Sequence, residues 1–184
     1  MRTALICSLV AGFGLLGTAT AQAQDAGKVG ITMGFPGSIG LLWHASDRVA
    51  LRPELTFSGA SSEADGPGEV EGDNWAIATG VGVLFYLNKQ DNLRTYFTPR
   101  IAYTRTSSST TISSVTTSTS ENTSNSLGVF GSFGAQYNLG EKFGVFGELG
   151  FGVTRAKARG GFSNAESRTT QWGTRAGVGV IYYP

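Results

Sequence analysis

The chain has few of the groups on which catalytic and metal sites most often depend. It carries one cysteine and one histidine among its 184 residues. The cysteine, Cys7, lies in an apolar N-terminal stretch, so a chain that has lost this stretch contains no thiol and no disulfide. The single histidine, His44, does not supply the several protein ligands of a zinc site. We therefore expect no metal and no other cofactor.

The chain also lacks an excess of charge of either sign. It has 14 basic and 13 acidic residues, and the balance becomes even if Arg2 is lost with the N-terminal stretch. A neutral chain offers no electrostatic reason to bind nucleic acid.

Long hydrophobic runs are missing except at the N-terminus. Residues 4–17 are apolar apart from Ser8, follow the positive Arg2, and precede the small residues Ala-Gln-Ala at 21–23. This run is shorter than the roughly 20 residues of a spanning helix, and its order is that of a secretory signal. We predict a signal peptide over residues 1–23, with an uncleaved anchor as the alternative, and one domain over residues 24–184. That domain can cross a membrane only as a closed barrel.

Apolar residues alternate with small or polar ones along most of the chain. In residues 75–87 the odd positions hold the large apolar side chains, and a period of two predicts a strand with two different faces. Its 27 glycines are double the usual frequency of about 7%, and the crowded inner face of a small barrel can use them. The sequence thus predicts an all-β fold, an eight-stranded antiparallel up-and-down transmembrane β-barrel. The expected strands are 28–35, 38–45, 48–59, 74–87, 93–106, 126–139, 142–155 and 168–183.

The connections between these strands alternate in length. Short turns follow the second, fourth and sixth strands, and long loops are expected at 60–73, 107–125 and 156–167. Outer-membrane barrels have short periplasmic turns and long external loops, so both termini are expected in the periplasm. The long loops are then candidate sites for a surface ligand. Loop 107–125, rich in Ser, Thr and Asn, is expected either to be mobile or to extend its strands as a polar ribbon.

Two local features leave alternatives open. Residues 28–45 form either a short hairpin around Pro36-Gly37 or one kinked strand, which would make the strand count odd. Pro53 and Pro99 lie inside predicted strands, and because proline lacks the N–H of the ladder we expect β-bulges there.

Five charged residues within strands share the parity opposite to the apolar face. They are Arg52, Glu54, Arg100, Glu148 and Arg175. An arginine facing lipid at mid-depth would cost roughly 2–4 kcal/mol, so we predict that these side chains point inward and pair across the lumen. We interpret this ion-pair layer as a structural plug, because eight strands leave room mainly for side chains. The alternative is a narrow ion path.

Two further groups of residues bear on function. Arg105, Arg155, Lys157 and Arg159 are expected just above the bilayer, where they would contact the phosphates of lipopolysaccharide. His44 with Ser46 could belong to a lipid A hydrolase, but the predicted topology puts His44 at the periplasmic end. We therefore expect a packing role for His44 and no catalysis.

Three stretches of strand sequence carry a family resemblance. They are residues 48–57 (Arg-Val-Ala-Leu-Arg-Pro-Glu-Leu-Thr-Phe), 98–103 (Thr-Pro-Arg-Ile-Ala-Tyr) and 178–183 (Val-Gly-Val-Ile-Tyr-Tyr). With the strand pattern over 28–183, they resemble the small outer-membrane barrel families of the OmpA-like and OmpX/Ail-like kind. The resemblance is at the level of fold. It implies an integral outer-membrane protein with a structural or cell-surface interaction role, inserted by the barrel-assembly machinery. A narrow ion or small-solute pore and a lipid A-modifying enzyme are the alternatives.

Overall fold

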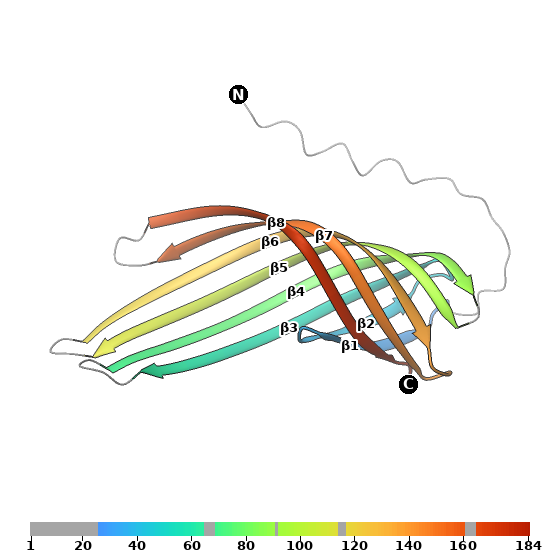
Figure 1. Ribbon diagram of the computed structural model, residues 1–184, viewed down its shortest axis with the longest axis horizontal. Helices are drawn as coiled ribbons and strands as arrows, with labels where there is room; N and C mark the ends of the chain where they lie inside the picture. The colour runs from blue at the N-terminus through green and yellow to red at the C-terminus, as the bar shows by residue number, and fades with distance from the viewer. Residues whose placement is uncertain (1–25, 65–68, 91, 114–116, 161–164) are drawn as a thin grey trace, which may run out of the picture.

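A computed structural model of the chain describes residues 26–64, 69–90, 92–113, 117–160 and 165–184, and the predicted signal peptide lies outside them. Eight antiparallel strands follow one another in chain order, and β1 pairs with β8 to close the ring (Figure 1). The strands are β1 (Val29–Phe35), β2 (Ser38–His44), β3 (Val49–Ala64), β4 (Glu69–Gln90), β5 (Leu93–Ser113), β6 (Thr117–Asn138), β7 (Phe143–Gly160) and β8 (Ala165–Tyr182). The described residues include no helix with the length and hydropathy that a membrane crossing requires.

Alternate residues of each strand point to opposite sides of the wall, as the period of two predicted. The outer side carries large apolar side chains that are open to the surroundings, for example Leu149, 66% exposed, Phe133, 65%, and Val129, 57%. Aromatic pairs lie on this outer face, Phe143 with Tyr182 at the short-turn end of β7 and β8 and Phe151 with Trp172 nearer the middle of these strands. An apolar band around a barrel, flanked by aromatic residues, is typical of a protein surrounded by lipid.

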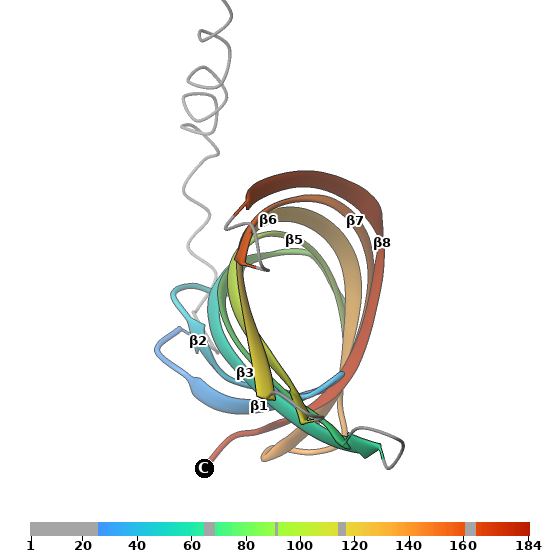
Figure 2. The same ribbon diagram turned by 90° about the vertical axis from the view of Figure 1, so that its left-hand side faces the viewer.

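The connections after β2, β4 and β6 lie at one end of the barrel, which we call the short-turn end, whereas the turn at Pro36-Gly37 lies away from it. The first residues of β1 and the last residues of β8 are also there, since Gly27 N–H donates to the His44 carbonyl and Tyr183 N–H donates to the Lys142 carbonyl. The opposite end, the long-strand end, carries the extensions of β3 to β8 (Figure 2). The alternation of connection lengths predicted both features.

The regions expected as long loops are mostly strand, which corrects the predicted boundaries. The described parts of 60–73, 107–125 and 156–167 continue the ladders without a break in register up to the pairs Ala64–Val70, Ser113–Thr117 and Gly160–Ala165, and residues 65–68, 114–116 and 161–164 lie outside the described residues. In 107–125, threonine and other β-branched residues suit a strand even when both faces are in water. The prediction stopped each strand where the apolar alternation ended, but the backbone pairing does not need apolar side chains.

Residues 28–45 form the predicted hairpin, so the alternative of one kinked strand is wrong. Its two strands have 7 residues each, whereas β3 to β8 have between 16 and 22. Beyond the hairpin, no described strand pairs with residues 56–64 of β3 or 165–177 of β8 on the side where β1 and β2 end. We call this place the open seam. The barrel is therefore closed at the short-turn end and open along one side above the hairpin.

The prolines do not cause the expected bulges. Pro53 stays in register with Val81, and Pro99 stays in register with Gly131. Each proline instead leaves a short gap in the ladder on its other side, toward β2 and toward β4, without a change of register. The missing N–H removes one ladder bond, and neighbouring pairs hold the alignment. The described irregularity lies elsewhere, between Tyr86 and Asn88 of β4.

Candidate functional site

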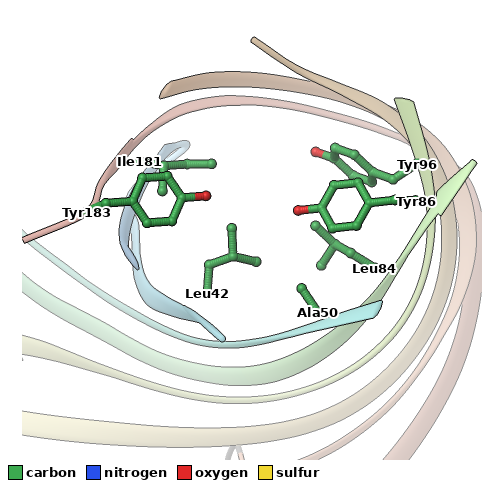
Figure 3. Packing of buried hydrophobic residues seen from close by; sticks show 7 residues of the cluster. All are labelled: Leu42, Ala50, Leu84, Tyr86, Tyr96, Ile181 and Tyr183. Atoms are coloured by element: carbon green, nitrogen blue, oxygen red, sulfur yellow. The ribbon is translucent and has the colours of Figure 1, made fainter. Parts of the chain in front are cut away.

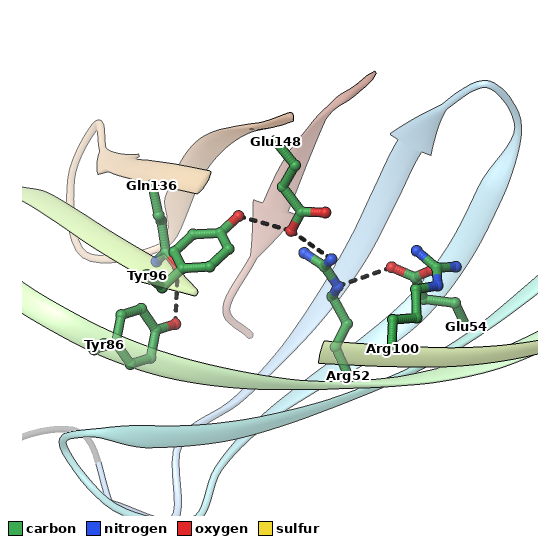
Figure 4. Close-up of polar contacts among 7 residues, drawn as sticks. All are labelled: Arg52, Glu54, Tyr86, Tyr96, Arg100, Gln136 and Glu148. Carbon is green, nitrogen blue, oxygen red and sulfur yellow. Dashed lines mark hydrogen bonds and ion pairs between the residues drawn. The ribbon is translucent and has the colours of Figure 1, made fainter. Parts of the chain in front are cut away.

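Four of the five charged residues predicted to face inward meet in the lumen (Figure 4). Arg52 of β3 is the centre of this cluster. Its Nε lies 2.8 Å from Oε1 of Glu54, two residues further along the same face, and its terminal nitrogen lies 2.5 Å from Oε1 of Glu148 on β7. Arg100 of β5 forms an ion pair with the second oxygen of Glu54. The structure thus joins four of the five predicted residues, and Arg175 does not pair with them.

These ion pairs are removed from water. The side chains of Arg52, Glu54 and Glu148 are 2%, 6% and 8% exposed. A charge at such a position needs an opposite charge and hydrogen bonds to offset its lost hydration. Arg52 provides this for two carboxylates at once because its planar guanidinium presents donors in several directions. The guanidinium carbon also lies 5.0 Å from the centre of the Phe146 ring.

Tyr96 adds a neutral donor to the cluster, and a glycine makes its position possible. The Tyr96 hydroxyl donates to Oε1 of Glu148 over 2.9 Å. Gly134 stands between them in the register, paired with Tyr96 on one side and Glu148 on the other. A Cβ on Gly134 would lie 2.5 Å from the Tyr96 ring. The tyrosine reaches Glu148 because it passes over a residue that has no side chain.

We expect Gly134→Ala to displace Tyr96 and break its hydrogen bond to Glu148. Overpacking of this kind costs about 1–3 kcal/mol, which urea unfolding of the refolded protein in lipid vesicles would measure. Gly131→Ala is the matched control, since Gly131 lies on the same strand and a Cβ there would be 3.5 Å from Phe97, at ordinary contact distance. Equal losses in the two variants would contradict the role given to Gly134.

Below the ion pairs, toward the short-turn end, polar and aromatic side chains fill the lumen. Tyr86 donates to Oε1 of Gln136, and the Gln136 amide donates to the Tyr183 hydroxyl, both over 3.1 Å. Leu42, Leu84 and Ile181 pack beside them (Figure 3).

His44 belongs to this packing. It is 1% exposed, stacks on Tyr86 with ring centres 5.7 Å apart, and its Nε2 lies 3.1 Å from the Tyr183 hydroxyl. Ser46, the partner considered in a hydrolase site, accepts instead from the backbone N–H groups of Arg48 and Val49 and holds the turn. No three His, Cys, Asp or Glu residues in the described part of the chain gather as metal ligands would.

Sequence reasoning missed several residues that complete this interior. They are Tyr86, Arg94, Tyr96 and Gln136, all buried. Each occupies a position with the same parity as the inward residues of its strand, so the alternation in the sequence could have identified it. Tyrosine and glutamine carry no charge, so the argument from inward charges does not reach them, and Arg94 lies at the end of its predicted strand rather than near its middle.

The predicted lipopolysaccharide contacts lie on the outer face, near the long-strand end. Arg105, Arg155, Lys157 and Arg159 are all exposed there. The register places Arg105, Asn125, Lys157 and Arg168 side by side across β5 to β8. The predicted basic surface does not include Arg168, because the predicted strand 168–183 begins only at this residue. The structure continues that strand to Ala165.

One acidic residue lies among these cations. Glu166 accepts from Arg168 Nε at 2.8 Å and from a terminal nitrogen of Arg159 at 3.1 Å. Hydrogen bonds from Arg168, and then from Arg159, hold the pKa of the Glu166 carboxyl below its usual value. Glu166 is therefore ionised at neutral pH and reduces the positive charge of the surface.

Comparison with known proteins places the fold. No family model and no curated protein sequence matches the chain. A major outer membrane protein from Thermus thermophilus is 14% identical, with a TM-score of 0.55, over 84% of this chain and 98% of that one. CarO from Acinetobacter baumannii is 13% identical, with a TM-score of 0.46, over 86% of this chain and 98% of its own. Ail, the attachment invasion locus protein of Yersinia pestis, is 12% identical, with a TM-score of 0.40, over 84% and 93%.

At these identities the likeness concerns the fold alone, and the Thermus protein is the one that supports it. Its architecture agrees with the closed ring of eight antiparallel strands and with the apolar outer face of this chain. The chain therefore has the fold of an eight-stranded outer-membrane β-barrel.

Proposed function

We propose that this protein is an integral outer-membrane barrel with a structural or cell-surface interaction role, a sealed lumen and no catalytic activity. The observation that carries the proposal is the filling of the lumen below its middle. The ion pairs of Arg52 occupy the centre, and the network of Tyr86, Gln136 and Tyr183 occupies the space beneath it. Side chains that satisfy one another in this way leave no continuous water path for ions.

The proposal includes an orientation of the barrel in the outer membrane. The short-turn end faces the periplasm and the extended parts of β3 to β8 stand outside the cell. These extensions are polar on both faces, as in the pair Thr111–Thr119, whose hydroxyls lie 3.3 Å apart. A paired polar ribbon holds its backbone groups in a fixed array, so it offers a surface ligand a more rigid partner than a mobile loop would.

Conductance separates a sealed barrel from a narrow pore. We expect the purified protein to give no stepwise conductance in planar bilayers, and we expect Glu148→Gln to leave the recordings unchanged. Discrete openings whose size or ion preference changes in Glu148→Gln would favour the pore. Fractionation with outer membranes and heat-modifiable gel migration, tested on the same preparations, establish that the recorded protein is the folded barrel.

We further propose that the outer basic surface contacts the phosphates of lipopolysaccharide. Arg105, Arg155, Lys157, Arg159 and Arg168 stand just beyond the apolar band, where Leu127 and Trp172 are exposed. Lipid phosphates lie at that height, and guanidinium groups bind phosphate through paired hydrogen bonds.

The double reversal Arg105→Glu with Lys157→Glu should weaken association with lipopolysaccharide. These two residues flank Asn125 in the register, so the change places two negative charges in the centre of the surface. Losing charge-assisted contacts to phosphate should reduce retention by about tenfold or more. The readout is lipopolysaccharide co-purified with the barrel at low ionic strength.

Two other variants control for net charge. Arg48→Glu with Lys142→Glu makes the same charge change at exposed positions of the short-turn end and should leave retention unchanged. Glu166→Gln removes the counter-charge of Arg159 and Arg168 and should increase retention. If both double reversals behave alike, the proposed contact is wrong.

A further inference from the structure

Arg175 is the predicted inward arginine that does not join the ion pairs centred on Arg52. The register pairs it with Gly150, two residues nearer the long-strand end than Glu148. Among the described residues it forms no ion pair and no hydrogen bond, and its guanidinium carbon lies 5.7 Å from the centre of the Phe130 ring. The layer of three guanidiniums and two carboxylates therefore keeps one positive charge without a partner.

A cavity of about 270 Å³ lies against this charge. Its lining includes the charged Arg100, Arg175 and Glu54, the apolar Phe130, Ala78 and Ala102, and threonines such as Thr56 and Thr104 (Figure 4 shows Arg100 and Glu54). It lies on the long-strand side of the ion pairs, above the filled part of the lumen. Its volume is too small for a large ligand and suits a small solute.

Glycines keep the space beside Arg175 open. Phe130 pairs in register with Gly152, and a Cβ on Gly152 would overlap the Phe130 ring. The ring can therefore lean across β7 toward β8, where Arg175 lies over it. The result is a cationic group held on an aromatic face, at the lining of the cavity.

The cavity extends to the open seam. Pro36, at the tip of the hairpin, and Ala176, on the unpaired edge of β8, both line it. Phe57 and Trp172, which lie beyond the last pairs with the hairpin, are exposed apolar residues on either side of the seam. A ligand can thus place a charged group at the arginines and an apolar group toward the seam.

We propose that this cavity binds a small organic carboxylate, a monoanion with a short apolar tail, with Arg175 and Arg100 holding the carboxylate. Guanidinium groups match the planar geometry of a carboxylate. One negative charge balances the one that the layer lacks, whereas the higher charge of phosphate would meet the Glu54 carboxylate in the same cavity. The Phe130 and alanine walls suit the tail. This site goes beyond the structural role proposed above, and a sealed lumen neither requires nor forbids it.

The test uses the whole barrel in lipid nanodiscs, with ¹⁵N-labelled arginine and the side-chain Nε–H signals as the readout. Hexanoate, hexanol and inorganic phosphate are the three probes. We expect hexanoate to shift the Arg175 and Arg100 signals saturably, while hexanol, which lacks the charge, and phosphate, which lacks the tail, bind at least about tenfold more weakly.

Three variants locate the site. Arg175→Gln should weaken hexanoate by about tenfold or more, followed on the Arg100 signal, because one charged partner is lost. Ala102→Leu should weaken it similarly by filling the cavity without changing charge, which keeps the test open if Arg175→Gln does not fold. Arg105→Gln, on the outer face, should leave binding unchanged. Unsaturable shifts, phosphate binding as tight as hexanoate, or unchanged binding in either cavity variant would overturn the proposal.

Discussion

Replacing Arg52 by methionine is expected to produce the largest loss of stability of any single change in the lumen. The substitution leaves Glu148 without its ion-pair partner and Glu54 with Arg100 alone, in a place where all three side chains are nearly inaccessible to water. Removing one partner of a buried ion pair costs about 3–5 kcal/mol because the remaining charge is left uncompensated. Urea unfolding in lipid vesicles, followed by tryptophan fluorescence, measures this free energy.

Two comparisons isolate the charge effect from lost packing. Arg48→Met removes an exposed arginine at the short-turn end and should change the free energy of unfolding by less than about 0.5 kcal/mol. In the double variant Arg52→Met with Glu148→Gln, no carboxylate lacks a partner, since Glu54 keeps Arg100. This variant should recover part of the stability. A double variant less stable than Arg52→Met alone would show that packing, not charge, dominates at this position.

The second large effect is expected on the outside of the barrel, from Leu149→Arg. Leu149 is 66% exposed and lies near the middle of the apolar band on β7. If Leu149 faced water, the substitution would remove few packing contacts and would lower the free energy of unfolding only slightly. Facing the hydrocarbon at mid-depth, arginine costs roughly 2–4 kcal/mol. The free energy of unfolding in lipid vesicles would therefore fall by this amount.

The control is Ile112→Arg, at a residue of the opposite parity that is 43% exposed on the extended part of β5, opposite Val70. It also introduces an arginine, but far beyond the apolar band, where the side chain meets water. We expect the free energy of unfolding to be nearly unchanged. Equal effects at the two positions would mean that the band does not face lipid, and the membrane assignment would fail with it.

The fold could be predicted because large apolar side chains alternate with small or polar ones along the sequence. Every second side chain of 75–87 except Thr79 is large and apolar, and this pattern indicates which face meets lipid. The ends of the strands could not be predicted in the same way. From Ser107 to Ser113 the side chains are polar on both faces, apart from Ile112, so the hydropathy pattern stops while the backbone ladder continues to Ser113.

The candidate site could be predicted only in part from the sequence, for a related reason. Parity identified the inward charges, and it was enough to predict that they would pair across the lumen. Parity does not give the level of each side chain along the barrel, because neighbouring strands are staggered and only the register reveals this. The ladder sets Arg175 opposite Gly150, two residues nearer the long-strand end than Glu148, and it forms no ion pair there.

The shortness of the first hairpin has a consequence for the surrounding bilayer. Residues 56–64 and 165–177 carry backbone N–H and C=O groups that no described strand of β1 or β2 satisfies, yet Phe57 and Trp172 in these same stretches are apolar and outward. Hydrocarbon does not tolerate unsatisfied peptide groups. At the level of Phe57 and Trp172, we therefore expect water to reach these backbone groups, so that the leaflet is thinner in this sector than elsewhere around the barrel.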